Sequence, residues 1–359
     1  MSPTKIAIAC QGGGSHTAFT AGVLKSFFEE KIHDKYKIVS LSGTSGGAVC
    51  AALAWSSLLA HNSKKIKSTE LSNRIVDFWL DNAAQNLPQE ILNKGVVQYA
   101  ELVEQGLLPE WKTSPSSKRN KALVDFSKMI LPGFYDLEYL LKKHMQYDEV
   151  KDCIKPDSPV LMVGASDVID GEFKVFKSPG EKNQDDVVVQ SILASSAIPS
   201  IYPAVPIGET SYWDGLYSTN PPINELFESD SEKDNKPDQI WVIQINPKKR
   251  DEAPTKSEDI IDRSNEMIGN FSLYSQLKSV LRFNDYIRDD AFTEEYKKGN
   301  NLKHIDIYVI TMSDEIMDSL AYSSKIDRSS KHIGNLINHG ETRGNEFLKD
   351  PESMRYCKC

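Results

Sequence analysis

Apolar and polar positions follow two alternating patterns over the first sixty residues. Residues 6–10 and 37–41 are short apolar-rich runs of strand length. Residues 15–30 carry apolar side chains at helical spacing, and the apolar run 48–54 reads as a second helix. Strand, helix, strand and helix in that order predict the start of an α/β fold around a mostly parallel central sheet.

The remainder of the chain extends this pattern. A mainly helical stretch, 62–150, precedes the next strand, and we expect it to be an insertion placed as a lid or substrate-binding cap. Its apolar face fits plain core packing or acyl-chain contact, and core packing is the commoner role. Residues 223–359 are expected to complete the sheet and add covering helices, within a single domain over 1–359. The expected helices also include 71–108, 122–146, 187–194, 260–287 and 330–348, and the expected strands 160–166, 172–176, 211–213, 239–245 and 304–310.

A glycine-rich turn with a central serine separates the second strand from its helix. Gly43, Ser45 and Gly47 stand in the order G-x-S-x-G. The flanking glycines allow a sharp strand-to-helix turn, which holds the serine hydroxyl at the helix N-terminus. The positive end of the helix dipole favours the negative charge that a nucleophilic serine develops. The context predicts that Ser45 is a nucleophile on an elbow formed with Gly43 and Gly47.

Three consecutive glycines follow the first strand. Gly12, Gly13 and Gly14 leave backbone N–H groups uncovered between a strand and a helix, an arrangement that binds anions. A phosphate cradle fits poorly, because the spacing matches neither the dinucleotide-binding pattern nor the Walker pattern with its closing lysine. A tight turn without a ligand and an oxyanion hole for acyl transfer both remain. The serine elbow on the next strand favours the oxyanion hole.

A third motif lies in the middle of the chain. Asp214 and Gly215 end the short strand 211–213. Asp before Gly is most often only a turn residue. The proline-broken segment 194–199 precedes this motif and must run beside the elbow if the motifs form one site.

Together these blocks resemble the patatin-like phospholipase family over residues 6–222. Four motifs occur in the family's order: the glycine loop, the G-T-S-G-G elbow, the A-S-x-A-x-P segment, and D-G followed by a proline turn. The resemblance implies a three-layer α/β sandwich and a lipid acyl hydrolase that works through an acyl-enzyme. It places the family's Ser–Asp dyad on Ser45 and Asp214, with Asp214 as the base for Ser45. Burial in an apolar cleft would raise the pKa of that carboxyl and make it a better base. Its oxyanion donors fall on Gly12, Gly13 and Gly14.

Two positions depart from the family pattern. Ser15 and His16 follow the glycines, where a basic residue and then glycine are usual, and Leu216 follows the D-G pair. We expect the first departure to affect substrate preference and the second to affect only packing beside the carboxylate.

The chain has seven histidines, which raises the alternative of a triad. In α/β-hydrolases the triad runs Ser, Asp or Glu, then His, and His304, His332 and His339 come late enough in the chain. A late helix is an unusual place for a catalytic imidazole, so the dyad without histidine is preferred. His16 follows the glycine loop and is expected either to touch a phosphate or head group or, as the favoured alternative, to face solvent.

The overall charge narrows the range of partners. A net charge of −9 argues against nucleic-acid binding and against strong general attraction to anionic lipid surfaces. Peripheral membrane contact through a local patch stays compatible with it. Lys64, Lys65 and Lys67 form one basic cluster, which we interpret as a solvated loop.

Targeting and metal signals are not recognised in the sequence. The first residues lead directly into a strand, and the longest apolar run, 48–60, is too short to cross a bilayer. Five scattered cysteines fit a reducing compartment, and no Cys/His cluster has zinc spacing. We therefore expect no metal, no cofactor, and a cytoplasmic or peripheral membrane protein. Secretion without a cleavable signal is also compatible with the sequence.

Three functions fit these observations. The preferred one is a calcium-independent serine lipid acyl hydrolase of phospholipase A or lysophospholipase type, acting on phospholipid or other lipid esters. The second is a carboxylesterase or thioesterase on a soluble acyl substrate, which a Ser-His-Asp triad would favour. The third is a binder that keeps the fold, or a hydrolase that needs a partner for activity. The sequence does not predict the head group, the position of the cleaved ester or the oligomeric state.

Overall fold

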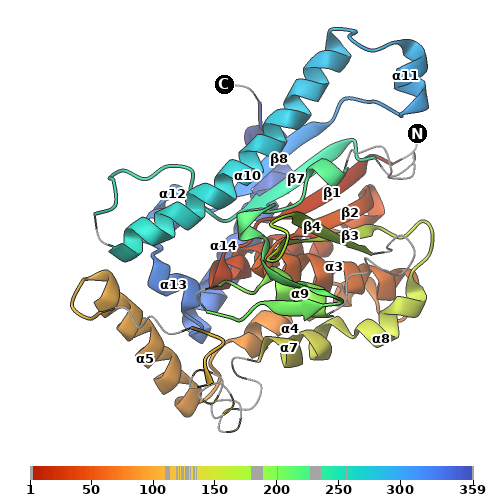
Figure 1. The fold of residues 1–359 in the computed structure, drawn as a ribbon. Helices are drawn as coiled ribbons and strands as arrows, with labels where there is room; N and C mark the ends of the chain where they lie inside the picture. The colour runs from red at the N-terminus through yellow and green to blue at the C-terminus, as the bar shows by residue number, and fades with distance from the viewer. Residues whose placement is uncertain are drawn as a thin grey trace.

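A computed structural model gives the fold of the chain (Figure 1). It describes residues 3–357 except 110–113, 179–188, 200, 227–235, 256 and several positions between 119 and 135. The described strands form one sheet in the order β5-β6-β3-β2-β1-β7-β8, with β4 paired to β3. Their bounds are β1 Lys5–Cys10, β2 Lys37–Gly43, β3 Val160–Asp167, β4 Phe173–Ser178, β5 Val205–Ile207, β6 Thr210–Asp214, β7 Gln239–Gln244 and β8 Asp306–Thr311.

The centre of the sheet is parallel, as predicted. β1 pairs in parallel with β2 and β7, β2 with β3, and β7 with β8. The remaining pairs, β3 with β4, β3 with β6, and β5 with β6, are antiparallel. Both faces of β1 are buried, with Ile6 and Ile8 in one apolar cluster and Ala7 and Ala9 in the other. The prediction of an α/β fold with a mostly parallel central sheet is confirmed.

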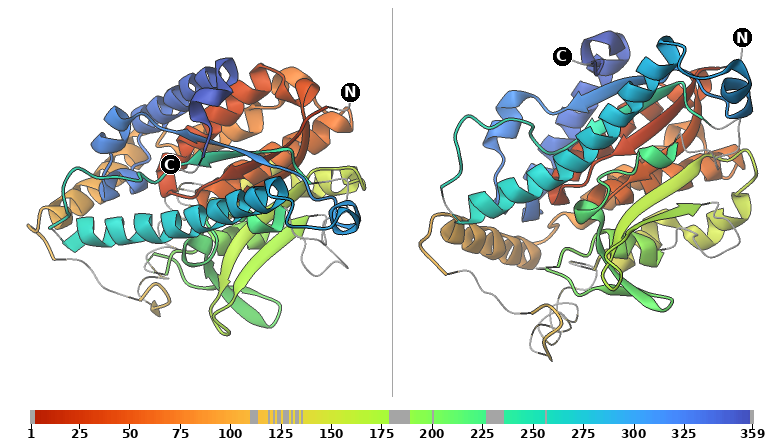
Figure 2. Two further views of the ribbon diagram at one scale, coloured as in Figure 1. Left: turned by 90° about the horizontal axis from the view of Figure 1, so that it is seen from above. Right: turned by 45° about the horizontal axis from the view of Figure 1, so that its top comes forward.

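Helices on both faces of the sheet make three layers. In Figure 2, α1, α3 and α14 lie on one side of the strands and α10 on the other. On the first face the ring of Trp241 lies 5.2 Å from Phe27 and 4.9 Å from Phe347. On the second face Leu273 and Leu277 of α10 join the apolar cluster of the opposite strand positions. The helix bounds are α1 Ala18–Glu29, α2 Ile32–Lys35, α3 Gly46–Asn62, α4 Asn73–Asn82, α5 Leu87–Glu104, α7 Leu137–Met145, α8 Tyr147–Val150, α9 Val189–Ser195, α10 Ser257–Arg288, α11 Glu294–Gly299, α12 Asp314–Ser319, α13 Tyr322–Ile326 and α14 Ser330–Lys349.

The expected helix over 71–108 is wrong in one respect, because it is broken into α4 and α5. The Ala84 N–H donates to the Arg328 carbonyl at 2.7 Å, so the chain between the helices pairs with a distant segment. The Asn86 side chain then caps α5 by accepting a hydrogen bond from the Gln89 N–H at 3.1 Å. Asn86 followed by Pro88 is a helix-start signal that the apolar periodicity concealed.

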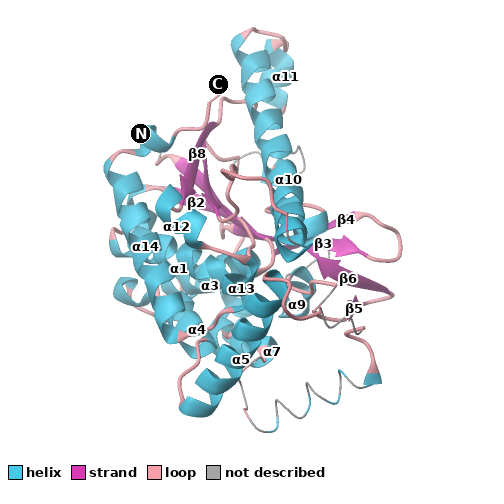
Figure 3. Ribbon diagram, turned by 90° about the vertical axis from the view of Figure 1, so that its left-hand side faces the viewer, coloured by secondary structure: helices cyan, strands magenta, loops and turns pink. Residues whose placement is uncertain are grey.

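The helices of the stretch 62–150 lie in different parts of the fold. Ile75 and Phe78 of α4 are buried in the main apolar cluster with α3, whereas α5 lies at the edge of the molecule beside α13 (Figure 3). The expected helix over 122–146 is described as α7 in its last part, and much of its earlier part lies outside the described residues. The division of the chain into a domain with an insertion stays a prediction.

Three further features concern membrane-spanning helices, free thiols and metal ligands. Among the described helices, none has both the length and the hydropathy needed to pass through a bilayer. Cys10, Cys50, Cys153 and Cys357 are free thiols. Within the same described residues, no three His, Cys, Asp or Glu side chains gather as metal ligands would.

Candidate active site

Two strand ends meet along one edge of β3. β2 pairs with β3 as far as Gly43 opposite Val163, and β6 pairs with β3 from Asp214 opposite Ala165. Because β4 occupies the other edge of β3, β2 and β6 must lie end to end on the same edge. β6 is antiparallel, so its last residue points toward the end of β2, where the turn to Ser45 begins. The register therefore brings together two motifs that are distant in the sequence.

The turn at Ser45 is sharp and strained. Ser45 has φ 56° and ψ −132°, and α3 begins immediately after it. A positive φ at a non-glycine residue typically costs about 1–3 kcal/mol and is common at catalytic turns. Two contacts hold the turn: the Ser45 N–H donates to Ser195 Oγ at 2.9 Å, and Ser195 Oγ donates to the Gly164 carbonyl at 2.6 Å. The segment 194–199 thus runs beside the elbow, as the sequence required.

The glycine loop lies directly against the elbow. A Cβ atom added to Gly12 would stand 2.8 Å from the Cβ of Ser45, so no side chain fits there. The Gly12 N–H donates to Asn220 Oδ1 at 2.7 Å and is engaged in this conformation. Within the described part of the chain, the N–H groups of Gly13 and Gly14 donate no hydrogen bond. Both glycines line the same cavity as Ser45.

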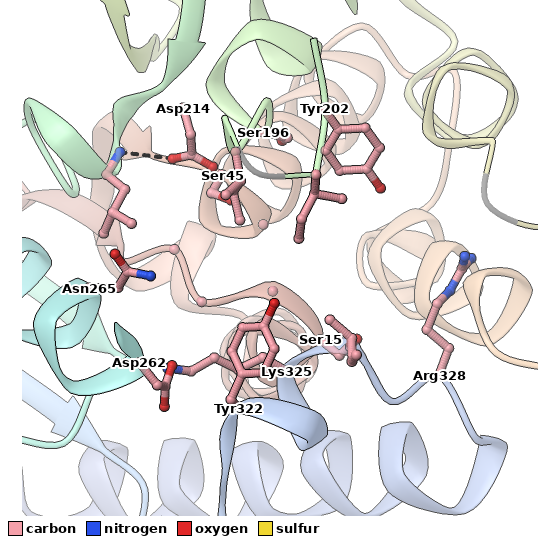
Figure 4. Close-up of a pocket in the computed structure, with 18 of the residues that line it drawn as sticks. Ser15, Ser45, Ser196, Tyr202, Asp214, Asp262, Asn265, Tyr322, Lys325 and Arg328 are labelled. Carbon is pink, nitrogen blue, oxygen red and sulfur yellow. Dashed lines mark hydrogen bonds and ion pairs between the residues drawn. The ribbon is translucent and has the colours of Figure 1, made fainter. Parts of the chain in front are cut away.

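Asp214 is a buried carboxylic acid beside the serine. Its side chain and that of Ser45 lie next to each other in Figure 4, and Oδ1 accepts a hydrogen bond from the Leu216 N–H at 2.8 Å. Burial raises the pKa of Asp214 from 3.8 to about 7, against smaller lowering effects of Leu216 and of the Ser45 hydroxyl. The other oxygen, Oδ2, has no partner of standard hydrogen-bond geometry among the described residues. The pair is adjacent but not fully aligned, which is common in catalytic sites without substrate.

A cavity of about 710 Å³ opens beside the pair. Its size lies within the usual range for small-molecule sites. Besides the elbow and the glycine loop, it is lined by apolar side chains of α3, α4 and α5, namely Val49, Phe78, Val96, Ala100 and Val103. Residues of both α4 and α5 therefore line the cavity, and Phe78 of α4 also belongs to the main apolar cluster.

The opposite wall of the cavity is polar and comes from α10 and α13. Asp262 and Glu266 are buried there and form ion pairs with Arg250 and Lys325. Burial alone would raise the pKa of Glu266, but Lys325 and the arginines hold it below its usual range. This network joins α10 to α13 across the cavity from the elbow.

Histidines take no part in lining the cavity among the described residues. His16 is only 3% exposed, and its Nε2 lies 2.7 Å from Ser324 Oγ on α13. The expectation that His16 faces solvent is wrong, because α13 packs over the first turn after the glycine loop. His339 accepts a hydrogen bond from the Ser313 N–H at 3.1 Å, away from the elbow. The arrangement favours the dyad over a triad.

Two residues that hold the site were not recognised from the sequence. Ser195 positions the Ser45 amide, and Asn220 engages the Gly12 amide. Both stand inside motifs noted above, the A-S-x-A-x-P segment and the proline turn after Asp214. A polar residue inside such a motif is the signal that the sequence offered.

Comparison with known proteins places this geometry in context. A family model described as patatin-like phospholipase matches residues 8–227. The search of curated proteins finds no match.

Three solved structures are among those to which this chain shows similarity. VipD from Legionella pneumophila is 12% identical over 99% of this chain and 68% of its own, with a TM-score of 0.39. The type III effector protein ExoU is 14% identical over 99% of this chain and 54% of its own, with a TM-score of 0.36. The structure of the complex of ExoU with SpcU from Pseudomonas aeruginosa is 16% identical over 99% of this chain and 52% of its own, with a TM-score of 0.35. This chain spans about half the length of the two ExoU chains.

Proposed function

This chain belongs to the patatin-like phospholipase family, and from that premise we propose that it is a serine lipid acyl hydrolase that cleaves carboxylic esters of phospholipids or lysophospholipids. The observation that carries the proposal is the position of Ser45 and the buried Asp214 side by side in the wall of one cavity, against the glycine loop. Neither a metal nor a cofactor is needed for the reaction proposed here.

In the proposed reaction, Ser45 Oγ attacks the ester carbonyl while Asp214 takes its proton. The negative oxygen of the tetrahedral intermediate accepts hydrogen bonds from the Gly13 and Gly14 amides, and each such donor typically lowers a barrier by about 3 kcal/mol. The intermediate collapses when the leaving alcohol takes the proton from Asp214. Water then attacks the acyl-enzyme with Asp214 again as base, releasing the fatty acid and restoring Ser45.

A pKa near 7 suits Asp214 for this double role. A carboxylate with the ordinary value of 3.8 is a weak base, whereas the buried group, raised to about 7, accepts and returns a proton near neutral pH. The apolar lining from α4 and α5 offers an acyl chain an environment of its own kind. The cavity thus favours a lipid ester over a small soluble ester.

The test of the nucleophile is covalent labelling by a fluorophosphonate probe. We expect the unaltered protein to be labelled at Ser45 and Ser45→Ala not to be labelled. Ser196 is a matched control, since it also lines the cavity but donates its hydroxyl to the Ile192 carbonyl at 2.9 Å. Ser196→Ala should keep its label. Labelling of Ser45→Ala, or hydrolysis at an unaltered rate by that variant, would remove Ser45 from the mechanism.

Chain length separates the lipid hydrolase from the soluble esterase. We expect kcat/KM on monomeric esters to rise as the acyl chain is lengthened, because each methylene buried in the cavity adds about 0.8 kcal/mol at most. Free fatty acid released from phospholipid and lysophospholipid, measured by mass spectrometry, then identifies the ester that is cleaved. A preference for acetyl over long-chain esters would favour the carboxylesterase or thioesterase alternative.

A further inference from the structure

The mouth of the cavity is surrounded by exposed apolar and aromatic side chains. Five lining residues are large, apolar or aromatic, and well exposed: Tyr99 at 38%, Ile201 at 41%, Tyr202 at 44%, Tyr217 at 44% and Ile261 at 41%. They come from α5, from the loop after α9, from the turn after β6 and from α10. Four separate segments thus present the same kind of side chain at one opening, and we call these five residues the rim.

The exposed apolar surface continues from the rim onto α10. Ile260, Met267 and Phe271 are exposed by 49%, 39% and 64% and do not line the cavity. At 3.6 residues per turn they share one face of the helix, and Ile261 of the rim lies about 100° further round. Ile268, half-buried, fills the angle between them. The rim and this outer face of α10 therefore form one mainly apolar surface, in which Ser264 is an exposed polar position.

We propose that this surface docks the protein on a phospholipid bilayer, so that a lipid passes from the membrane into the cavity without crossing water. This inference rests on the proposed function and identifies the physical source of its substrate. Contiguous exposed apolar patches of this kind mark interaction sites. Tyrosine, three times present in the rim, suits the membrane interface because its ring is apolar and its hydroxyl polar. Continuity with the cavity makes the bilayer the occupant, because the ligand of the cavity comes from there.

The charge of the chain sets the kind of bilayer. With a net charge of −9 the protein gains no general attraction to anionic lipid. Docking through the rim and α10 is therefore driven by insertion of apolar side chains, and it should occur on zwitterionic phosphatidylcholine and persist at high salt.

The experiment measures vesicle binding by the full chain carrying Ser45→Ala, which cannot hydrolyse the lipid. We expect this protein to sediment with phosphatidylcholine vesicles. Adding Phe271→Ser should weaken partitioning about tenfold or more, because a large apolar side chain then no longer enters the membrane. Phe173→Ser is the matched control, since Phe173 on β4 is 70% exposed and does not line the cavity. It should bind as before.

A second measurement separates docking from catalysis. On a monomeric water-soluble ester, Phe271→Ser in the active protein should keep its kcat/KM, whereas hydrolysis of vesicle phospholipid should fall about tenfold. If the unaltered protein does not hydrolyse the soluble ester, the proposed function is contradicted, but the result of the vesicle-binding experiment still holds. Failure to bind phosphatidylcholine, binding only to anionic vesicles with release by salt, or equal weakening by Phe271→Ser and Phe173→Ser would overturn the docking proposal. The first of these results would instead favour a protein partner for the surface.

Discussion

The two walls of the cavity are built in different ways. The wall that carries Ser45 and the glycine loop is formed by backbone: a Cβ added to Gly12, Gly43 or Gly47 would stand 2.5, 2.4 or 2.2 Å from a backbone oxygen. The helical wall of α5, α10 and α13 is formed by side chains, and a Cβ added to Gly95 of α5 would meet nothing within 4 Å. The backbone therefore leaves no room for an added methyl group at these three glycines, whereas α5 has room for one at Gly95.

The comparison predicts its largest effect at Asp214. Asp214→Asn keeps the shape of the backbone wall but removes the base, so kcat/KM should fall about 10³-fold or more. The measurement is hydrolysis of a soluble ester, with circular dichroism to verify the fold. Activity within a factor of a few of the unaltered protein would mean that another group takes the proton of Ser45.

The same substitution should raise stability, and the effect has a defined pH dependence. In the folded protein the pKa of Asp214 is raised from 3.8 to about 7, so between these values only the native state holds the proton and stability falls as pH rises. At pH 8 Asp214→Asn should be more stable by about 1–4 kcal/mol, and near pH 4 the difference should largely vanish. Urea unfolding at the two pH values measures it. An equal effect at both would show that the ionised carboxylate carries no burial penalty.

A methyl group placed in the backbone wall should give the next largest effect. In Gly47→Ala the new Cβ meets the carbonyl oxygens of Cys10 at 2.2 Å and Gln11 at 2.7 Å, so β1 and α3 must separate. Overpacking of this kind costs about 1–3 kcal/mol or more, and Ser45 would move with the helix. Thermal unfolding and probe labelling should both decline. Unchanged stability and labelling would show that this wall is less rigid than the contacts indicate.

The pH dependence of activity should follow the ionisation of Asp214. The base must be ionised, so kcat/KM should rise tenfold per pH unit below the pKa and level off above a midpoint of about 7. A profile measured on a neutral soluble ester reports this group in the free protein. A midpoint near 4 would mean that Asp214 is solvated in solution and would weaken the whole assignment.

The smallest effect is expected in the helical wall, with opposite sign. Gly95→Ala places a methyl group in open space inside α5, and Ala is favoured over Gly in a helix interior by about 0.5–1 kcal/mol. Stability should therefore rise slightly, and activity should not change. Since the substitution is the same as at Gly47, the pair tests the difference between the walls directly. Destabilisation by Gly95→Ala would place α5 in the same class as the elbow.

The two walls also differ in how far the sequence predicts them. The backbone wall consists of short motifs on consecutive strands, so its strands, its turn at Ser45 and its glycine loop follow from local pattern. The proximity of Asp214 was expected only through the family resemblance, because strand register is not a local property. The contact of the Gly12 amide with Asn220, 208 positions away, could not be foreseen for the same reason.

The helical wall depends almost wholly on long-range contacts. His16 was expected to face solvent, but it is covered by Ser324, 308 positions later in the chain. The break between α4 and α5 arises where Ala84 pairs with the Arg328 carbonyl. Periodicity predicts that a helix exists and which face is apolar, but not which distant segment covers or interrupts it.

The end-to-end arrangement of β2 and β6 along β3 fixes the distance between Ser45 and Asp214. A slip of β6 by two residues along β3 would displace the carboxylate by about 7 Å, and a slip by one residue would turn it to the other face of the sheet. The distance between the Asp214 carboxyl and the Ser45 hydroxyl is thus set by the register of β2 and β6 on β3, whatever the lengths of the loops on either side. Insertions in the β5–β6 hairpin or in the long segment between α3 and β3 should therefore leave this distance unchanged, provided that the register is kept.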